Sequence, residues 1–169
     1  MTENGQPLGI VSRERGSVHL ERTIAAGLDD VWAAWTDPAR MSAWLAPVEG
    51  SAPAAGATFR LRMTADETAT CTVQAWEPPR LLELTWDYTG EGPSRLRLQL
   101  AAVDGGTRLV LDHDRLVHGD PAGYGAGWHA ELDLLAAHLA GEPKPSFMPR
   151  YEELLPSYRA AAGGRRLAH

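Results

Sequence analysis

The stretch TRLVLDHDRLVHGDPAGYGAGWHAELDLLAAHLAG, residues 107–141, contains the two patterns that decide the fold. Its first part has the alternation of a strand with one buried face, and the inward positions are Leu109, Leu111 and His113. Its second part has apolar side chains at intervals of four, three and four, namely Trp128, Leu132, Leu135 and Leu139. That spacing predicts an amphipathic helix, and Gly141 and Pro143 indicate its end. A strand therefore leads into one long helix.

The sequence before this stretch repeats the strand alternation several times. The apolar positions of these predicted strands are Val18, Leu20 and Ile24, then Phe59, Leu61 and Met63, then Cys71, Val73 and Ala75, then Leu82, Leu84, Trp86 and Tyr88, and finally Leu96, Leu98 and Leu100. Short turns at Pro78-Pro79, Gly90 to Pro93 and Asp104-Gly105-Gly106 separate the later strands, which predicts an antiparallel meander. Two short helices, around Leu28 to Trp35 and after Pro38, follow the first strand.

This order of elements is typical of an α+β fold in one domain. We expect residues 1–17 to form a flexible lead-in, because they mix glycine, proline and charge without periodicity. Residues 18–141 form the predicted domain, and residues 142–169 form a proline-rich linker with a short helix that Pro156 would kink or divide. Apolar side chains in that tail should pack on the domain or on a second copy, so a homodimer through the tail is one expectation.

Composition excludes several classes of partner. The chain has 169 residues, with 16 Lys and Arg against 22 Asp and Glu, for a formal net charge of −6. This balance disfavours nucleic acid and anionic membrane surfaces as partners. Cys71 is the single cysteine, and the chain has neither a secretory signal nor an apolar run of about 18 residues. We therefore expect a cytoplasmic protein without membrane insertion.

The chain also resembles a known family through short blocks that follow the family's order. They are Glu21-Arg22-Thr23-Ile24, Val31-Trp32, Trp35-Thr36-Asp37-Pro38, Trp44, Pro47, Gly56, Phe59-Arg60, Pro78-Pro79-Arg80-Leu81-Leu82, Thr85-Trp86, Gly106-Thr107-Arg108-Leu109, His113 and Gly127-Trp128. The resemblance is to the bacterial activator-of-heat-shock-protein-ATPase-like (Aha-type) family of the START-like, or SRPBCC, superfamily. It implies the helix-grip fold, also called Bet v-like, with a curved antiparallel sheet around the long helix and a hollow between them.

Three positions depart from the family's pattern. Ala26-Gly27 replaces Ala-Pro, Leu45 replaces a common tryptophan, and Ala55-Gly56 replaces Gly-Gly. These changes affect the rim of the implied hollow more than the fold. Members of the superfamily share the frame without sharing a catalytic set, so fold alone does not define function.

The candidate ligand-binding residues are the inward strand positions and the helix stripe. They are Trp35, Trp44, Phe59, Leu61, Met63, Leu84, Trp86, Tyr88, Leu98, Leu111, His113, Trp128, Leu132 and Leu135. Any core uses such residues, so ordinary packing is the alternative for each. His113 is also the one weak catalytic candidate, although a buried histidine is more often bonded to a neighbour. Arg22 could meet an acidic ligand or be neutralised by Glu21, Asp87 or Asp112.

The remaining motifs point away from cofactor chemistry. With one cysteine and no pair of histidines at ligand spacing, we expect no metal and no other cofactor. The glycine-rich segment Gly119 to Gly127 lacks a P-loop lysine, so we expect a mobile mouth over the hollow.

Three functions remain open at this stage. The first is binding of a small, largely apolar or aromatic ligand, including a lipid, in a cavity between the sheet and the long helix. The second is an enzyme like the polyketide cyclases and dehydratases, with His113 moving protons. The third is a co-regulator of a chaperone ATPase. The sequence leans away from an enzyme and identifies neither the ligand nor a reaction.

Overall fold

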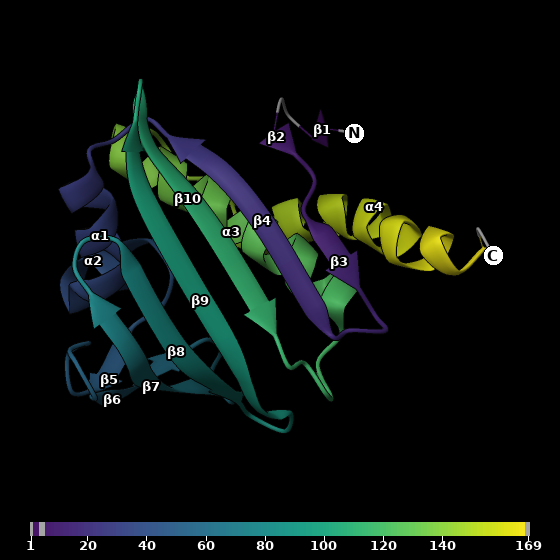
Figure 1. Cartoon of the computed structure of the whole chain (residues 1–169), viewed down its shortest axis with the longest axis horizontal. Coiled ribbons are helices and arrows are strands. Elements are labelled where there is room, and N and C mark those ends of the chain that lie inside the picture. Colours follow the sequence, from purple (N-terminus) through teal and green to yellow (C-terminus); the bar gives the residue numbers. More distant parts are fainter. Residues whose placement is uncertain (1, 4–5, 168–169) are drawn as a thin grey trace.

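The computed structural model describes residues 2–3 and 6–167, and its centre is a curved antiparallel sheet of eight strands (Figure 1). The strands lie in the order β3-β4-β10-β9-β8-β7-β6-β5. Their bounds are β3 (Ile10–Ser12), β4 (Ser17–Ile24), β5 (Val48–Gly50), β6 (Thr58–Arg62), β7 (Thr68–Glu77), β8 (Leu81–Tyr88), β9 (Gly92–Val103) and β10 (Gly106–Asp114). A separate pair, β1 (Thr2–Glu3) and β2 (Gln6–Pro7), precedes them.

Four helices complete the chain among the described residues: α1 (Leu28–Thr36), α2 (Pro38–Trp44), α3 (Pro121–Ala140) and α4 (Phe147–Leu167). Figure 1 shows α3 crossing one face of the sheet behind β10 and β4, with α1 and α2 at one end of the sheet. The predicted α+β fold, a curved antiparallel sheet around a long helix with two short helices after the first predicted strand, is confirmed. The first predicted strand is β4, and the three short strands before it were not expected.

The local signals for α3 act at both of its ends. Pro121 occupies the first turn, and the Asp120 side chain accepts a hydrogen bond from the Ala122 N–H at 3.2 Å. Gly141 ends the helix in the left-handed conformation, with a φ of 70°. The glycines of residues 121–127 therefore lie in the first turns of a helix, and the predicted mobile mouth there is wrong.

The N-terminal segment is more ordered than expected. Strand β3 pairs with β4 along the edge of the sheet, with Val11 opposite Val18, and Val11 is buried. A strand of three residues is too short to show an alternation in sequence, so its partner strand decides its conformation. The sheet thus begins within the segment that was expected to be a lead-in.

The C-terminal segment forms one continuous helix that packs on α3 and β3. Leu154, Tyr158 and Ala162 are buried in this contact, as expected for a tail that packs on its own domain. Pro156 does not divide α4. It is exposed together with Glu152, one turn earlier, so water can satisfy the carbonyl group that loses its N–H partner.

No helix in the described part of the chain has the length and apolarity needed to span a bilayer.

Candidate functional site

A pocket of about 350 Å³ opens between the first half of α3, one end of the sheet and the start of α4. It is lined by Met63, Glu67, Trp86, Tyr88, Glu91, Asp120, Gly123, Tyr124, Gly127, Trp128, Glu131, Phe147 and Tyr151. This volume lies at the lower end of the range for small-molecule sites. The pocket can therefore hold a compact organic molecule.

The helical period places one stripe of α3 against the pocket. The residues are Gly123, Tyr124, Gly127, Trp128 and Glu131, spaced by three and four positions. From the sheet side, Trp86 and Tyr88 come from β8, while Glu67 and Glu91 lie in the turns that precede β7 and β9. Phe147 and Tyr151 from α4 complete the lining. Elements distant in sequence thus converge on one site.

Aromatic rings form most of the apolar wall. The rings of Trp86 and Trp128 meet edge to face, with centroids 5.2 Å apart, and those of Phe147 and Tyr151 stack at 5.7 Å. Such ring pairs favour defined relative positions beyond simple burial. The wall therefore offers fixed ring surfaces to a planar or apolar guest.

Two tyrosine hydroxyls at the pocket are oriented by carboxylates. Tyr88 donates to Glu67 Oε1 at 2.9 Å, and Tyr124 donates to Glu91 Oε1 at 2.6 Å. Desolvation, strengthened by these acidic partners, raises the pKa of both phenols. Both hydroxyls therefore stay protonated and hold their carboxylates in place at the pocket.

Glu131 is the most unusual group of the pocket. Its side chain comes from α3, the residue is only 7% exposed, and its Oε2 atom is buried without a hydrogen-bond partner. Burial raises the pKa of this carboxyl from 4.5 to about 8. A buried polar atom without a partner costs stability, and Trp35 Nε1 and His129 Nε2 in the packed core also lack one. What sets Glu131 apart is that its unpartnered oxygen belongs to a carboxyl group that lines the pocket.

Two glycines of α3 show how the helix leaves room for the pocket. A Cβ atom at Gly127 would meet nothing within 4 Å, although this residue lines the pocket. At Gly125 a Cβ atom would come within 2.7 Å of both Tyr158 and Val11. Gly125 therefore allows close packing against α4 and β3, whereas Gly127 leaves space next to the aromatic wall.

His113 lies behind this wall with both ring nitrogens bonded. Its Nδ1 accepts from Trp128 Nε1 at 3.0 Å, and its Nε2 lies 2.7 Å from Ser94 Oγ. Because Ser94 Oγ donates to the Trp86 carbonyl at 3.0 Å, Nε2 is assigned as the protonated nitrogen. Burial lowers the pKa of His113 to about 3. A neutral, fully bonded imidazole positions Trp128 and has no free lone pair for a substrate.

The structure separates the predicted site residues into two groups. Met63, Trp86, Tyr88 and Trp128 line the pocket. The others do not: Trp35, Trp44, Phe59, Leu61, Leu84, Leu98, Leu111, His113, Leu132 and Leu135 are at most 3% exposed and pack in the core. Trp44, for example, donates to the Ala34 carbonyl at 2.8 Å and contacts Trp35. The space between sheet and helix is therefore filled over much of its length and open at one end.

The pocket also contains residues that the sequence interpretation missed. They are Glu67, Glu91, Asp120, Gly123, Tyr124, Gly127, Glu131, Phe147 and Tyr151. One signal was available in α3, because the stripe through Trp128 continues back to Tyr124 and forward to Glu131, a carboxylate within an apolar helix face. The turn and α4 residues depend on tertiary contacts and carry no comparable signal.

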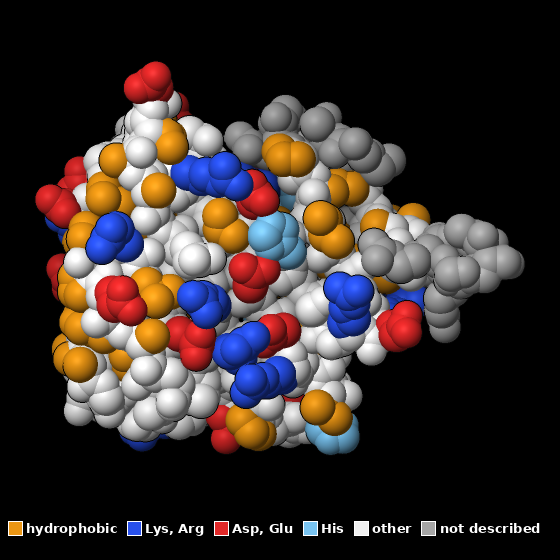
Figure 2. Space-filling model, in the orientation of Figure 1, with side chains coloured by type: hydrophobic (Ala, Val, Ile, Leu, Met, Phe, Trp, Pro, Cys, Tyr) orange, Lys and Arg blue, Asp and Glu red, His pale blue; other side chains and the backbone are white. Residues whose placement is uncertain are grey.

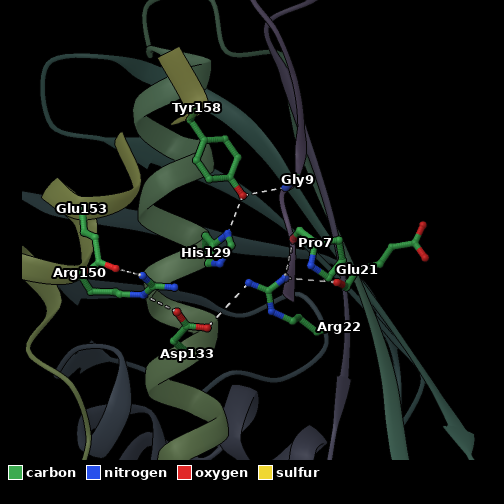
Figure 3. A network of polar contacts seen from close by, with 9 residues as sticks. All are labelled: Pro7, Gly9, Glu21, Arg22, His129, Asp133, Arg150, Glu153 and Tyr158. Atoms are coloured by element: carbon green, nitrogen blue, oxygen red, sulfur yellow. Dashed lines mark hydrogen bonds and ion pairs between the residues drawn. The ribbon is translucent and has the colours of Figure 1, made fainter. Parts of the chain in front are cut away.

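A second polar cluster, largely buried, lies where α3 meets α4 and β4 (Figure 3). Arg150 donates to Asp133 Oδ2 at 2.8 Å, and Arg22 Nη2 lies 3.8 Å from Asp133 Oδ1. The Tyr158 hydroxyl accepts from the Gly9 N–H and lies 2.7 Å from His129 Nδ1. Arg22 thus has its acidic partner in Asp133, which was not among the expected ones. The cluster joins β4, α3 and α4 and does not line the pocket.

The outer face of the sheet carries charged side chains of both signs (Figure 2). Arg95 pairs with Asp114 at 2.5 Å, and Arg97 lies 3.5 Å from Glu83. These are solvated pairs of modest energy. No group of three His, Cys, Asp or Glu side chains within residues 2–3 and 6–167 is arranged to hold a metal ion.

Comparisons with known proteins agree with this architecture. Residues 25–140 match the family model described as activator of Hsp90 ATPase homolog 1-like protein. The crystal structure of CalU16 from Micromonospora echinospora is 30% identical over 86% of this chain and 87% of that chain, with a TM-score of 0.73. The solution structure of the BPP1335 product from Bordetella parapertussis is 31% identical over 94% of each chain, with a TM-score of 0.68.

A third similar structure is DynU16, from the dynemicin biosynthetic locus. It is 25% identical over 78% of this chain and 50% of that chain, with a TM-score of 0.70. Among curated proteins, none matches the chain.

Proposed function

The chain belongs to the family of activator of Hsp90 ATPase homolog 1-like proteins, and from that premise we propose that it binds a small, largely apolar or aromatic molecule in the pocket beside α3. One observation carries the proposal: an open pocket of about 350 Å³ combines rigid aromatic walls with a buried carboxyl group that has an unpartnered oxygen. Apolar walls with a few convergent polar groups are the usual features of a small-molecule site.

The details of α3 support binding over simple packing. A glycine inside a helix costs about 1 kcal/mol relative to alanine, and no neighbouring atom requires a glycine at position 127. The missing side chain leaves open the space between Tyr124 and Glu131. The helix therefore carries a stability cost at the point where a guest would contact it.

The other two hypotheses have less support. An enzyme that uses His113 would need a free imidazole nitrogen, and both nitrogens of His113 are bonded within the core. A chaperone co-regulator would need a defined docking surface, for which the described residues offer no specific candidate. We therefore place ligand binding first.

The test is a binding experiment with a variant that fills the pocket. The purified chain is denatured and the released small molecules are identified by mass spectrometry, and a panel of lipids and polyketide-like aromatics is screened by thermal shift. A bound ligand raises the melting temperature by mass action. We expect Gly127→Leu to lose both the co-purifying molecule and the thermal shifts, because its side chain occupies the pocket.

Ala136→Leu is the matched control, because it adds side-chain volume to an exposed position of the same helix. This control should bind as the original chain does. Equal binding by Gly127→Leu, or no binding by the original chain across the panel, would refute the proposed pocket.

A further inference from the structure

The charges of the pocket have one sign. Four acidic side chains line it, namely Glu67, Glu91, Asp120 and Glu131. Lys, Arg and His are all missing from the described residues of the lining. A concave site lined by one sign of charge concentrates ligands of the opposite sign and repels those of the same sign. Fatty acids and phosphorylated molecules are therefore poor candidates for this pocket.

Glu131 supplies a direct contact for a ligand. It is more than nine-tenths buried, and the protein gives its Oε2 atom no hydrogen-bond donor. The carboxylates of Glu67 and Glu91 differ in this respect, because each accepts a hydrogen bond from a tyrosine. A protonated amine beside Glu131 would donate a hydrogen bond to the buried oxygen, and any cationic group there would compensate the charge of the ionised carboxylate.

The aromatic wall fits the same type of ligand. Cations bind favourably to the faces of tryptophan and tyrosine rings, and the effect grows when water is excluded. Trp128 donates its indole N–H to His113, and the ring of Trp86 packs against the ring of Trp128 edge to face. The rings beside Glu131 thus serve as contact surfaces for a guest.

We infer that the ligand of the proposed pocket is an aromatic or apolar molecule that carries an amine or ammonium group, with Glu131 as its counter-ion. The inference rests on the proposed function, because it specifies the chemistry of the molecule that the pocket binds.

Proton release should accompany binding. The pKa of Glu131 in the empty pocket is about 8, so the carboxyl is largely protonated at neutral pH. A cation prefers the ionised form, and its affinity should rise as pH approaches and passes this pKa. The other titratable groups of the lining are Glu67, Tyr88, Glu91, Asp120, Tyr124 and Tyr151.

The experiment compares three probes of similar size on the intact chain. Phenyltrimethylammonium carries a permanent positive charge, tert-butylbenzene is its neutral isostere, and benzoate carries a negative charge. Binding is measured by tryptophan fluorescence, because Trp86 and Trp128 line the pocket, and by calorimetry. At pH 8.5 we expect the cation to bind about tenfold more tightly than the neutral isostere and benzoate to bind most weakly.

The pH dependence identifies Glu131 as the group responsible. Between pH 6 and pH 9 the affinity for phenyltrimethylammonium should rise on the order of 10- to 100-fold. Glu131→Gln should abolish this rise and weaken cation binding at pH 9 while leaving tert-butylbenzene binding unchanged. The control Glu142→Gln removes an exposed carboxylate that does not line the pocket and should keep the full pH dependence.

The outcomes separate this inference from the function on which it rests. Equal or tighter binding of tert-butylbenzene or benzoate would overturn the inference and leave the proposed pocket standing. An unchanged pH dependence in Glu131→Gln would overturn the role of Glu131. Failure of all three probes and of the broader ligand panel would overturn both proposals.

Discussion

Helix α3 has two faces that differ in how they are covered: one packs against neighbouring elements, and the other borders the open pocket. The pocket face consists of Gly123, Tyr124, Gly127, Trp128 and Glu131, and the packed face consists of Ala122, Gly125, Ala126, His129 and Asp133. Each face has at least one glycine, where no side chain projects from the helix, and one acidic residue that is mostly shielded from water. On the packed face the neighbouring elements fill the space, whereas on the pocket face the space stays open.

The two carboxylates show what the difference means. Asp133 interacts with Arg150 and Arg22, which come from α4 and β4. Glu131, only two positions away, leaves a buried oxygen without a partner. A buried charge that the protein itself compensates serves the fold, because removing Asp133 takes away the acidic partner of the buried Arg22. A buried carboxyl that the protein leaves uncompensated is available for a ligand.

The largest expected change in the free energy of unfolding comes from removing the Asp133 carboxylate on the packed face. Asp133→Asn removes the acidic partner of the buried Arg22 and one of the two carboxylates that bind Arg150, which keeps Glu153 at 2.8 Å. Removing one partner is the costly way to disrupt a buried ion pair. We expect the free energy of unfolding to fall by about 3–5 kcal/mol. Urea denaturation at neutral pH measures this change.

The control for this variant is Asp30→Asn. Asp30 pairs with Arg40 at 3.7 Å on the surface, with both side chains well exposed. Such a pair contributes about 1 kcal/mol or less. If both variants lost the same small amount of stability, the packed face would not depend on its charged cluster.

On the pocket face we expect the substitution Glu131→Gln to raise the free energy of unfolding, by an intermediate amount. In the unfolded chain the pKa of Glu131 is near 4.5, and in the folded chain it is about 8. Between these values the unfolded state releases a proton that the folded state retains, so this residue lowers stability as pH rises from about 5 to 8. Glu131→Gln should remove that loss, and its stability relative to the original chain should increase by about 2–4 kcal/mol over this range.

Urea denaturation at pH 5 and pH 8 provides the comparison. Glu142→Gln again serves as the control, because Glu142 is exposed just beyond the end of α3. Its stability relative to the original chain should change little with pH. A flat difference between the original chain and Glu131→Gln would show that Glu131 is already ionised in the folded protein and would weaken its proposed role.

Much of this architecture could be predicted because periodic burial leaves a periodic sequence. The alternation of Leu109, Leu111 and His113 and the spacing of Trp128, Leu132 and Leu135 both correspond to buried faces in the structure. The short strand β3 and the unbroken α4 could not be predicted in the same way. Their conformations depend on partners distant in sequence, such as Val18 opposite Val11 and α3 beside Tyr158.

The pocket was less predictable for a related reason. Inward-facing apolar side chains identify the space between sheet and helix, but they do not reveal which part of that space the chain fills itself. Leu98 and Leu111 share the pattern of Trp86 and Tyr88, yet only the two aromatic residues line the pocket. Residues that interrupt the apolar pattern, such as Gly127 and Glu131, indicate the position of the pocket better than the apolar residues that conform to the pattern.

The smallest effects are expected from the two glycines, and they test the comparison most directly. Gly125→Ala places a methyl group within 2.7 Å of Tyr158 and Val11, so we expect a loss of about 1–3 kcal/mol from overpacking. Gly127→Ala meets no atom within 4 Å and improves the helix propensity, so we expect a gain of up to about 1 kcal/mol. The two substitutions are chemically identical and lie in the same helix, so propensity alone predicts equal gains. Melting temperatures that rise for Gly127→Ala and fall for Gly125→Ala would show that only one face is closed by its neighbours, whereas a fall for both would mean that the space beside Gly127 is already filled in solution.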